Sequence, residues 1–140
     1  MADRGSYVLF VDCVSPTSID VGALGERAFT VGTYAYVGSA FGSGGLSRVD
    51  RHRRVASGDH DVRHWHIDYL LAAQPVRLAG VQTFVNADVE CSLAAVLSAS
   101  GCERVDGFGC SDCDCASHLF GPTTAGSIAA AIRQVDHGSL

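Results

Sequence analysis

The chain has 140 residues, 47% of them apolar, which indicates one globular domain, 1–140, with a single core. Its longest apolar runs are about five residues, against the roughly 20 of a membrane helix, and its N-terminus lacks a signal-peptide pattern. We therefore expect a cytoplasmic protein with no membrane partner. The net charge is −5 and all ten basic residues are arginine, so nucleic-acid binding would need a local basic surface on an acidic body.

β-Branched and aromatic residues predict strands at Ser6–Val14, at Thr33–Val37, which Gly38 closes, and at Val76–Val85. Between the first two, Ile19–Val31 predicts a short hairpin. The expected sheet is therefore small and antiparallel.

Helical spacing of apolar residues follows the second and third strands. We expect helices at Leu46–Arg54, His64–Ala73, Val89–Ser100 and Ile128–Val135. Val55–Val62 is predicted as a polar loop, Asp88 as a helix cap, and Thr123 or Thr124 as the cap of the last helix. The fold class is then α+β, with a central antiparallel sheet flanked by helices.

Six cysteines without a secretory signal are expected to be thiols. Cys13, Cys91 and Cys102 stand among apolar residues and are predicted to fill the core. The loop 109–118 carries four soft ligand side chains, namely Cys110, Cys113, Cys115 and His118. They could bind zinc, but the spacing is tighter than in most zinc knuckles, so we favour a tight loop with buried thiols and with His118 facing the cleft.

Two tyrosines in the segment TYAYVGSA, Tyr34 and Tyr36, share one face of the predicted strand. They could be a packed aromatic pair, or one of them could be a reagent. The next helix places Arg48 and His52 four positions apart, on one face.

A strand ending in Tyr36-Val37-Gly38, then a glycine-rich loop and a helix with Arg and His, resembles the GIY-YIG nuclease superfamily. Gly5-Ser6-Tyr7 would be the first half-motif. The segments GSYVL, YAYVGSA, GGLSR, HWHIDYLL and GCSDCDCASHLF follow the order of one branch, called DUF123 or Uri-type endonucleases. Tyr7 and Tyr36 are 29 positions apart, so we expect an insertion between the two paired strands, and Tyr34 becomes a packing neighbour.

The resemblance implies a role for each matching residue. Tyr7 or Tyr36 would be the general base, which requires a nearby cation to lower the pKa of the phenol. Arg48 would contact a phosphate oxygen, and His52 would relay a proton or hold the phosphate. Glu90 would hold one Mg²⁺ or Mn²⁺ ion.

The implied function is a divalent-metal-dependent endonuclease that hydrolyses DNA phosphodiester bonds in repair or processing, with RNA not excluded as substrate. Arg51, Arg53, Arg54 and His66 are the candidates for nucleic-acid binding, although an arginine-rich helix is more often a solvated face. His64 and Asp68 could hold a metal ion, but we favour the alternative in which the histidines border a nucleic-acid-binding groove. The alternative function is a non-catalytic module that binds nucleic acid or zinc on the same scaffold.

Overall fold

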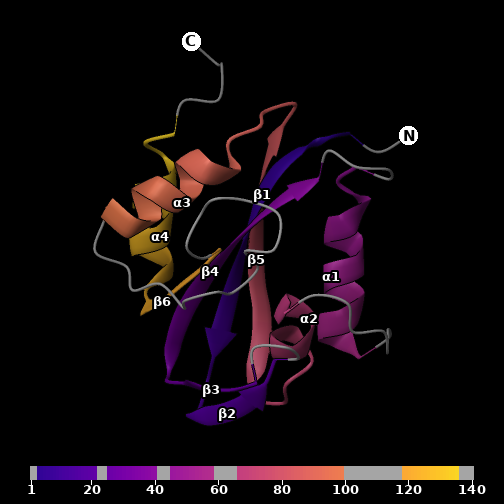
Figure 1. Ribbon diagram of the computed structural model, residues 1–140, viewed down its shortest axis with the longest axis vertical. Helices are drawn as coiled ribbons and strands as arrows, with labels where there is room; N and C mark the ends of the chain where they lie inside the picture. The colour runs from indigo at the N-terminus through magenta and orange to yellow at the C-terminus, as the bar shows by residue number, and fades with distance from the viewer. Residues whose placement is uncertain (1–2, 22–24, 41–44, 59–65, 100–117, 136–140) are drawn as a thin grey trace.

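Four strands form the central sheet of the protein. The computed structural model describes residues 3–21, 25–40, 45–58, 66–99 and 118–135. In these ranges the sheet is antiparallel in the order β5-β1-β4-β6, and β2 and β3 form a separate small sheet (Figure 1). The strands are β1 Gly5–Cys13, β2 Thr17–Asp20, β3 Glu26–Phe29, β4 Gly32–Ala40, β5 Val76–Val85 and β6 Leu119–Thr123. The helices are α1 Ser47–Ser57, α2 His66–Leu71, α3 Glu90–Ala99 and α4 Ala125–Ile132.

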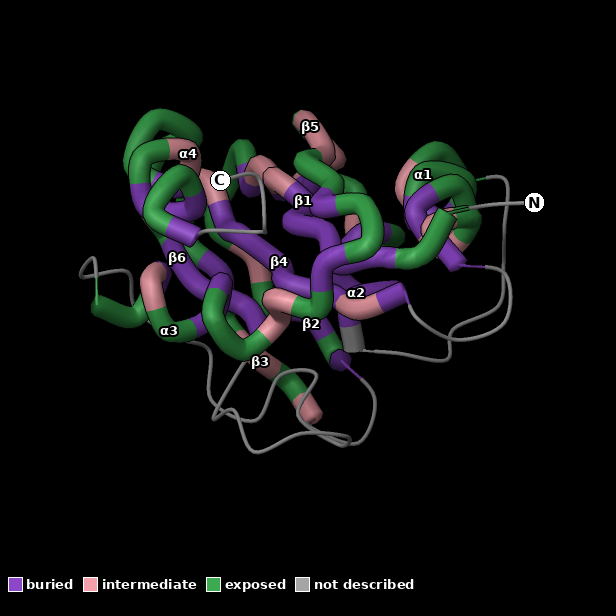
Figure 2. The backbone as a smooth tube through the Cα atoms, turned by 90° about the horizontal axis from the view of Figure 1, so that it is seen from above, coloured by how far each residue is buried: buried purple, intermediate pink, exposed green. Residues whose placement is uncertain are grey.

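Side chains alternate between the two faces of the sheet and divide the core into two parts. On one face, Tyr7, Leu9 and Tyr36 pack with apolar residues of α1 and α2. On the other face, Val8 and Val37 pack with apolar residues of α3 and α4. Figures 1 and 2 show the sheet between these two helix pairs. The expected α+β class with a central antiparallel sheet is therefore confirmed.

The β2–β3 hairpin is the expected insertion between the two paired strands. β1 and β4 lie side by side in antiparallel register, with Leu9 opposite Tyr36, and the hairpin is the connection between them. It lies at one end of the sheet, at the bottom of Figure 1. Ile19 and Phe29 are buried and belong to the same core as Tyr7.

Helix α1 is longer than the sequence analysis predicted. The segment Val55–Val62 was expected to be a loop, but α1 continues to Ser57. Val55 is fully buried and lies in step with Val49 and His52, so the inner face of the helix needs this extra turn. Gly58 then ends the helix with a left-handed backbone, φ 86°, and its N–H bonds to the last carbonyls.

Two strand predictions were wrong. Gly38 does not end β4, which continues to Ala40 because β1 pairs with it along its whole length. Strand β6 was not predicted at all. It contains Pro122, which has no N–H to donate, and it fits the sheet because β6 is an edge strand.

Smaller corrections concern the helix ends and one cysteine. Thr124, one of the two predicted caps, accepts a hydrogen bond from the Ser127 N–H, so α4 begins at Ala125. Cys13 is buried as predicted, but Cys91 is exposed because the buried face of α3 is formed by other residues. Cys102 lies outside the described residues. In the part of the chain that the structure describes, no helix combines the length and apolarity needed to cross a membrane.

Candidate active site

Tyr7 points into the core below α1, and the glycine opposite it makes this possible. Tyr7 of β1 pairs with Gly38 of β4. A Cβ atom built on Gly38 would clash with the hydroxyl end of the Tyr7 ring, at its Cζ, Oη and Cε2 atoms. The glycine of the second half-motif therefore provides the space for the tyrosine of the first.

Two tyrosines and a histidine meet beneath α1. The Tyr7 hydroxyl and Nε2 of His52 are 2.7 Å apart, which is hydrogen-bond distance. The Tyr36 ring lies edge-on to the same imidazole, with ring centroids 6.2 Å apart. All three side chains are buried, with exposed fractions of 1%, 8% and 1% for Tyr7, Tyr36 and His52.

Tyr34 plays the packing role that was predicted for it. Its hydroxyl accepts a hydrogen bond from the Thr30 N–H at 3.0 Å and donates one to the Thr30 carbonyl at 3.1 Å. Its ring packs edge-on against Phe29 of the inserted hairpin, at 5.6 Å between centroids. Tyr34 therefore secures the hairpin to β4.

Arg48 lies one helical turn before His52 and borders the tyrosines. Its guanidinium donates a hydrogen bond of 2.7 Å to the Ser39 carbonyl at the end of β4. Its charge also acts on the Tyr7 and Tyr36 hydroxyls, lowering the pKa of each. Arg48 is only partly buried, whereas both phenols are buried.

Burial is the largest cause of the pKa shifts of Tyr7, Tyr36 and His52. It raises the pKa of Tyr7 well above the usual value for a phenol, and the neighbouring Arg48 only partly offsets this. It raises the pKa of Tyr36 as well. Burial lowers the pKa of His52 to about 4, with Asp68 opposing the shift and Arg51 and Arg48 adding to it. At neutral pH both phenols are therefore protonated and the imidazole is neutral, so Nε2 of His52 can accept the Tyr7 proton.

Glu90 approaches the same tyrosines from α3, the helix on the other face of the sheet. Its charge raises the pKa of both Tyr7 and Tyr36. The start of α3 is held by Ser6, whose Oγ donates to the Ala87 carbonyl at 2.8 Å and accepts from the Val89 N–H at 3.0 Å. Two consecutive residues of β1 thus contribute to the site: Tyr7 is part of it, and Ser6, the residue before it, positions the helix that carries Glu90. Sequence reasoning missed this role of Ser6, although a polar residue in a buried strand was a signal for it.

His118 is the buried neighbour of Glu90. Its Nδ1 atom lies 3.6 Å from Oε2 of Glu90, and the exposed fractions of the two side chains are 5% and 18%. The His118 carbonyl accepts a hydrogen bond of 2.8 Å from the Val37 N–H, just before β6 begins. The prediction that His118 faces a cleft stays a prediction; the structure shows that it lies beside Glu90.

Asp68 is a further buried charge near the site. It is fully buried and forms a two-pronged ion pair with Arg51, with both N–O distances 2.9 Å. Its charge acts on His52, Tyr7 and Tyr36. Arg51, which the sequence suggested as a nucleic-acid contact, thus holds α2 against α1.

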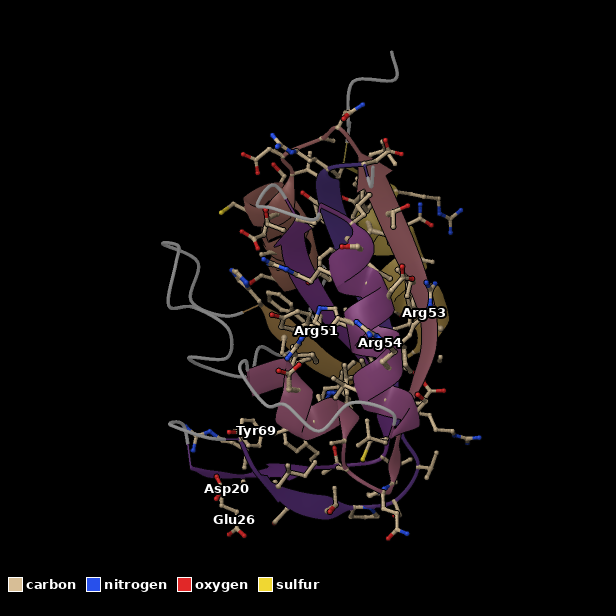
Figure 3. The ribbon with its side chains drawn as sticks, turned by 90° about the vertical axis from the view of Figure 1, so that its right-hand side faces the viewer. Asp20, Glu26, Arg51, Arg53, Arg54 and Tyr69 are labelled. Carbon is tan, nitrogen blue, oxygen red and sulfur yellow. The ribbon has the colours of Figure 1, made fainter. Side chains whose placement is uncertain are left out.

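The other predicted nucleic-acid contacts lie apart from the tyrosines. Arg53 and Arg54 are exposed on α1 (Figure 3). Arg53 is 3.4 Å from Asp50 and lines an open cavity of about 490 Å³ against β5, whose lining includes none of the tyrosine cluster. His66 is the first residue of α2, and its side chain is outside what the structure describes.

The predicted zinc ligands are tested only in part. Cys110, Cys113 and Cys115 lie outside the described residues, so the zinc prediction stays a prediction. Among the residues that are described, no group of three or more His, Cys, Asp or Glu side chains is arranged to hold a metal ion. Glu90 and His118 are two possible ligands, one fewer than the smallest such group.

These features define an α+β protein with a tyrosine–histidine–arginine cluster on one face of its sheet and a Glu–His pair beside it. The chain belongs to the DUF123 family: the model described as "Domain of unknown function DUF123" matches residues 6–139. No curated protein and no solved structure matches it.

Proposed function

We propose that this protein is a GIY-YIG-type endonuclease that hydrolyses DNA phosphodiester bonds with the help of a divalent metal ion. The observation that carries the proposal is the 2.7 Å contact between the Tyr7 hydroxyl and Nε2 of His52, with the Arg48 guanidinium close enough to act on Tyr7. Hydrolysis of a phosphodiester needs an acceptor for the proton of water and a cation beside the phosphate. This cluster contains residues suited to both tasks.

The proton of the attacking water would leave through Tyr7 and His52. Because burial raises the pKa of Tyr7, its phenolate is too unfavourable to be the resting base. Instead, water gives a proton to the Tyr7 oxygen as the Tyr7 proton passes to Nε2 of neutral His52. Burial lowers the pKa of His52 to about 4, so the imidazolium formed in this step depends on the charge of Asp68, which favours it. The hydroxide forms a bond to phosphorus, and the bond from phosphorus to the leaving oxygen breaks.

Arg48 is the residue suited to the phosphate. Its guanidinium stays charged, and its planar set of N–H donors matches the oxygens of a phosphate; in the structure it bonds to the Ser39 carbonyl. Arg48 is partly exposed, while Tyr7 and His52 are buried. A phosphate that approaches from solvent would therefore meet the guanidinium before the Tyr7–His52 pair.

Glu90 is the candidate metal ligand. Its side chain is 18% exposed, and its charge raises the pKa of both Tyr7 and Tyr36. A cation bound to Glu90 would therefore lie close to the tyrosine cluster. Carboxylate oxygen suits Mg²⁺ and Mn²⁺. When bound, such an ion would stabilise the negative charge that develops on the phosphate and on the leaving oxygen.

The test is cleavage of supercoiled plasmid and of branched DNA with Mg²⁺ or Mn²⁺, with RNA as a competing substrate. Arg48→Ala and Glu90→Gln should each reduce the rate by about 100-fold or more, the usual effect of losing one group that stabilises a transition state. The matched control is Arg133→Ala, an exposed arginine after α4 on the other face of the sheet, and it should keep the wild-type rate. An inactive wild type with either metal, or full activity in both variants, would contradict the proposal.

Metal analysis of the purified protein distinguishes the alternative function. One stoichiometric zinc that is lost in Cys113→Ser, together with DNA binding without cleavage, would favour a non-catalytic zinc-binding module.

A further inference from the structure

Glu90 and His118 come from distant parts of the chain and meet beside the tyrosine cluster. Glu90 begins α3, and His118 precedes β6. The His118 side chain is almost fully buried, while Glu90 is partly open to solvent. A buried imidazole beside a more exposed carboxylate is a pair of metal ligands with one accessible side.

The distance between the two groups suits a shared cation better than a direct hydrogen bond. Nδ1 of His118 and Oε2 of Glu90 are 3.6 Å apart, and an N–H···O bond would be about 2.7–3.2 Å. Two ligand atoms that are each about 2.0–2.2 Å from one metal ion stand about 2.8–3.1 Å apart at adjacent octahedral positions and about 3.3–3.6 Å apart in tetrahedral geometry. The observed separation of 3.6 Å matches tetrahedral geometry, so an octahedral ion would draw the two side chains about 0.5 Å closer together.

Hydrogen bonds tie each residue of the pair to one of two neighbouring strands. The His118 carbonyl accepts the Val37 N–H of β4, and the next residue, Leu119, pairs with Tyr36. On the other side, Ser6 of β1 holds Ala87 and Val89 at the start of α3. Because β1 and β4 are neighbours in the sheet, the two ligands are held in place by the strands that carry the tyrosines.

We propose that His118 is a second ligand of the metal ion held by Glu90, and that this oxygen–nitrogen pair selects Mn²⁺ over Mg²⁺. The inference rests on the proposed function, whose metal ligand is Glu90 alone. Mg²⁺ prefers oxygen ligands and keeps most of its waters, whereas an imidazole favours ions with more affinity for nitrogen. Mn²⁺ accepts both carboxylate and imidazole.

The test detects nitrogen at the metal directly. Protein labelled with ¹⁵N-histidine is loaded with Mn²⁺, and pulsed electron paramagnetic resonance measures coupling between the metal and a histidine nitrogen. Wild type should show the coupling, and His118→Gln should lose it. Isothermal titration should show Mn²⁺ affinity falling by about tenfold or more in His118→Gln, since even outer partners of metal ligands typically contribute that much. Cys91→Ser is the matched control, because Cys91 is the exposed neighbour of Glu90 on α3 and should leave both measurements unchanged.

Two results would overturn the inference: Mn²⁺ bound to wild type without nitrogen coupling, or Mn²⁺ affinity unchanged in His118→Gln. The first needs no variant, so it decides the question even if the substitution impairs folding. DNA cleavage by a wild type without the coupling would remove His118 as a ligand and keep the nuclease. Coupling in a protein that cleaves no DNA would keep the site and remove the nuclease.

Discussion

At the scale of single residues, the Tyr-Val-Gly segment and the Gly-Ser-Tyr segment depend on each other. Gly38 has no side chain where the Tyr7 ring lies, and Tyr7 reaches His52 across that gap. Ser6, whose side chain points to the other face, holds the start of the helix that carries Glu90. The glycine thus positions Tyr7, and the serine positions the start of the helix that carries Glu90.

Gly38→Ala should displace the Tyr7 ring and weaken its bond to His52. We expect a loss of about 1–3 kcal/mol in the free energy of unfolding, the usual cost of overpacking a core, measured by urea denaturation. Gly80→Ala is the matched control, because the nearest atom to its new Cβ is Phe10 Cβ at an ordinary 3.9 Å. In a Tyr7→Ala background, the cost of Gly38→Ala should shrink. An equal cost in both backgrounds would show that the two residues do not interact.

His52 should make stability depend on pH between about 6.5 and 4. Its pKa is about 4 in the folded protein and 6.5 in an unfolded chain, so in that window the unfolded state binds a proton that the folded state does not. Stability is therefore complete above pH 6.5 and falls as the pH drops, by up to about 3 kcal/mol from this group. Denaturation at pH 7 and pH 4.5 should show a smaller fall in His52→Gln than in wild type. A folded-state pKa near 6.5, measured by nuclear magnetic resonance, would refute this account.

At the scale of elements, α1 carries different functions on its different sides. Its inner face presents His52 to the tyrosines, and one edge presents Arg48 to the end of β4. Another residue, Arg51, binds Asp68 of α2. Arg54 is on the exposed side of the helix (Figure 3). The Arg51–Asp68 ion pair therefore joins α2 to α1, the helix that carries the proposed catalytic residues Arg48 and His52.

Asp68→Ala should destabilise the protein by about 3–5 kcal/mol, because it leaves the mostly buried Arg51 without its carboxylate. The exposed pair Asp50–Arg53 is the control, and Asp50→Ala should change the free energy of unfolding little. Replacing both members of the buried pair, as Arg51→Met with Asp68→Leu, should cost less than Asp68→Ala alone. Urea denaturation of the four proteins measures this, and equal effects of Asp68→Ala and Asp50→Ala would contradict it.

At the scale of the whole molecule, the site is formed by two layers that meet around the sheet. His52 and Arg48 come from the helix layer on one face, and Glu90 comes from the helix layer on the other (Figure 2). The protein as a whole carries a net charge of −5. A polyanion such as DNA would therefore depend on the few outward arginines, among them Arg54 on the exposed side of α1.

Arg54→Ala should reduce the salt dependence of DNA binding. If Arg54 contacts one phosphate, the slope of log affinity against log salt concentration should become smaller by about 1, and binding should weaken equally for all sequences. Fluorescence anisotropy with labelled duplexes at several salt concentrations measures the slope. Arg133→Ala, on the other helix layer, is the control with an unchanged slope. A slope unchanged in Arg54→Ala would place the DNA elsewhere on the surface.

Local patterns were sufficient for most elements. Val76–Val85 was predicted with its observed bounds, because β-branched residues and a preceding proline mark it clearly. The hairpin and the caps at Thr124 and Gly58 also have local signals, although the last was overlooked. Strand β6 could not be predicted from its own residues, since only its pairing with β4 makes a proline-containing segment a strand.

The sequence by itself determined the alternation of the strands, the helical spacing of Arg48 and His52, and the separate role of Tyr34, because these depend on neighbours along the chain. The tertiary structure decided which side chains meet. The register between β1 and β4 sets Gly38 opposite Tyr7, whose hydroxyl reaches His52. Glu90 meets His118 because the start of α3 lies beside the residue that precedes β6. It also reversed the simple expectation for the phenols: burial outweighs the nearby arginine and raises the pKa of Tyr7, so this phenol stays protonated at neutral pH. Burial and long-range contact arise only when distant segments pack together, which no short stretch of sequence specifies.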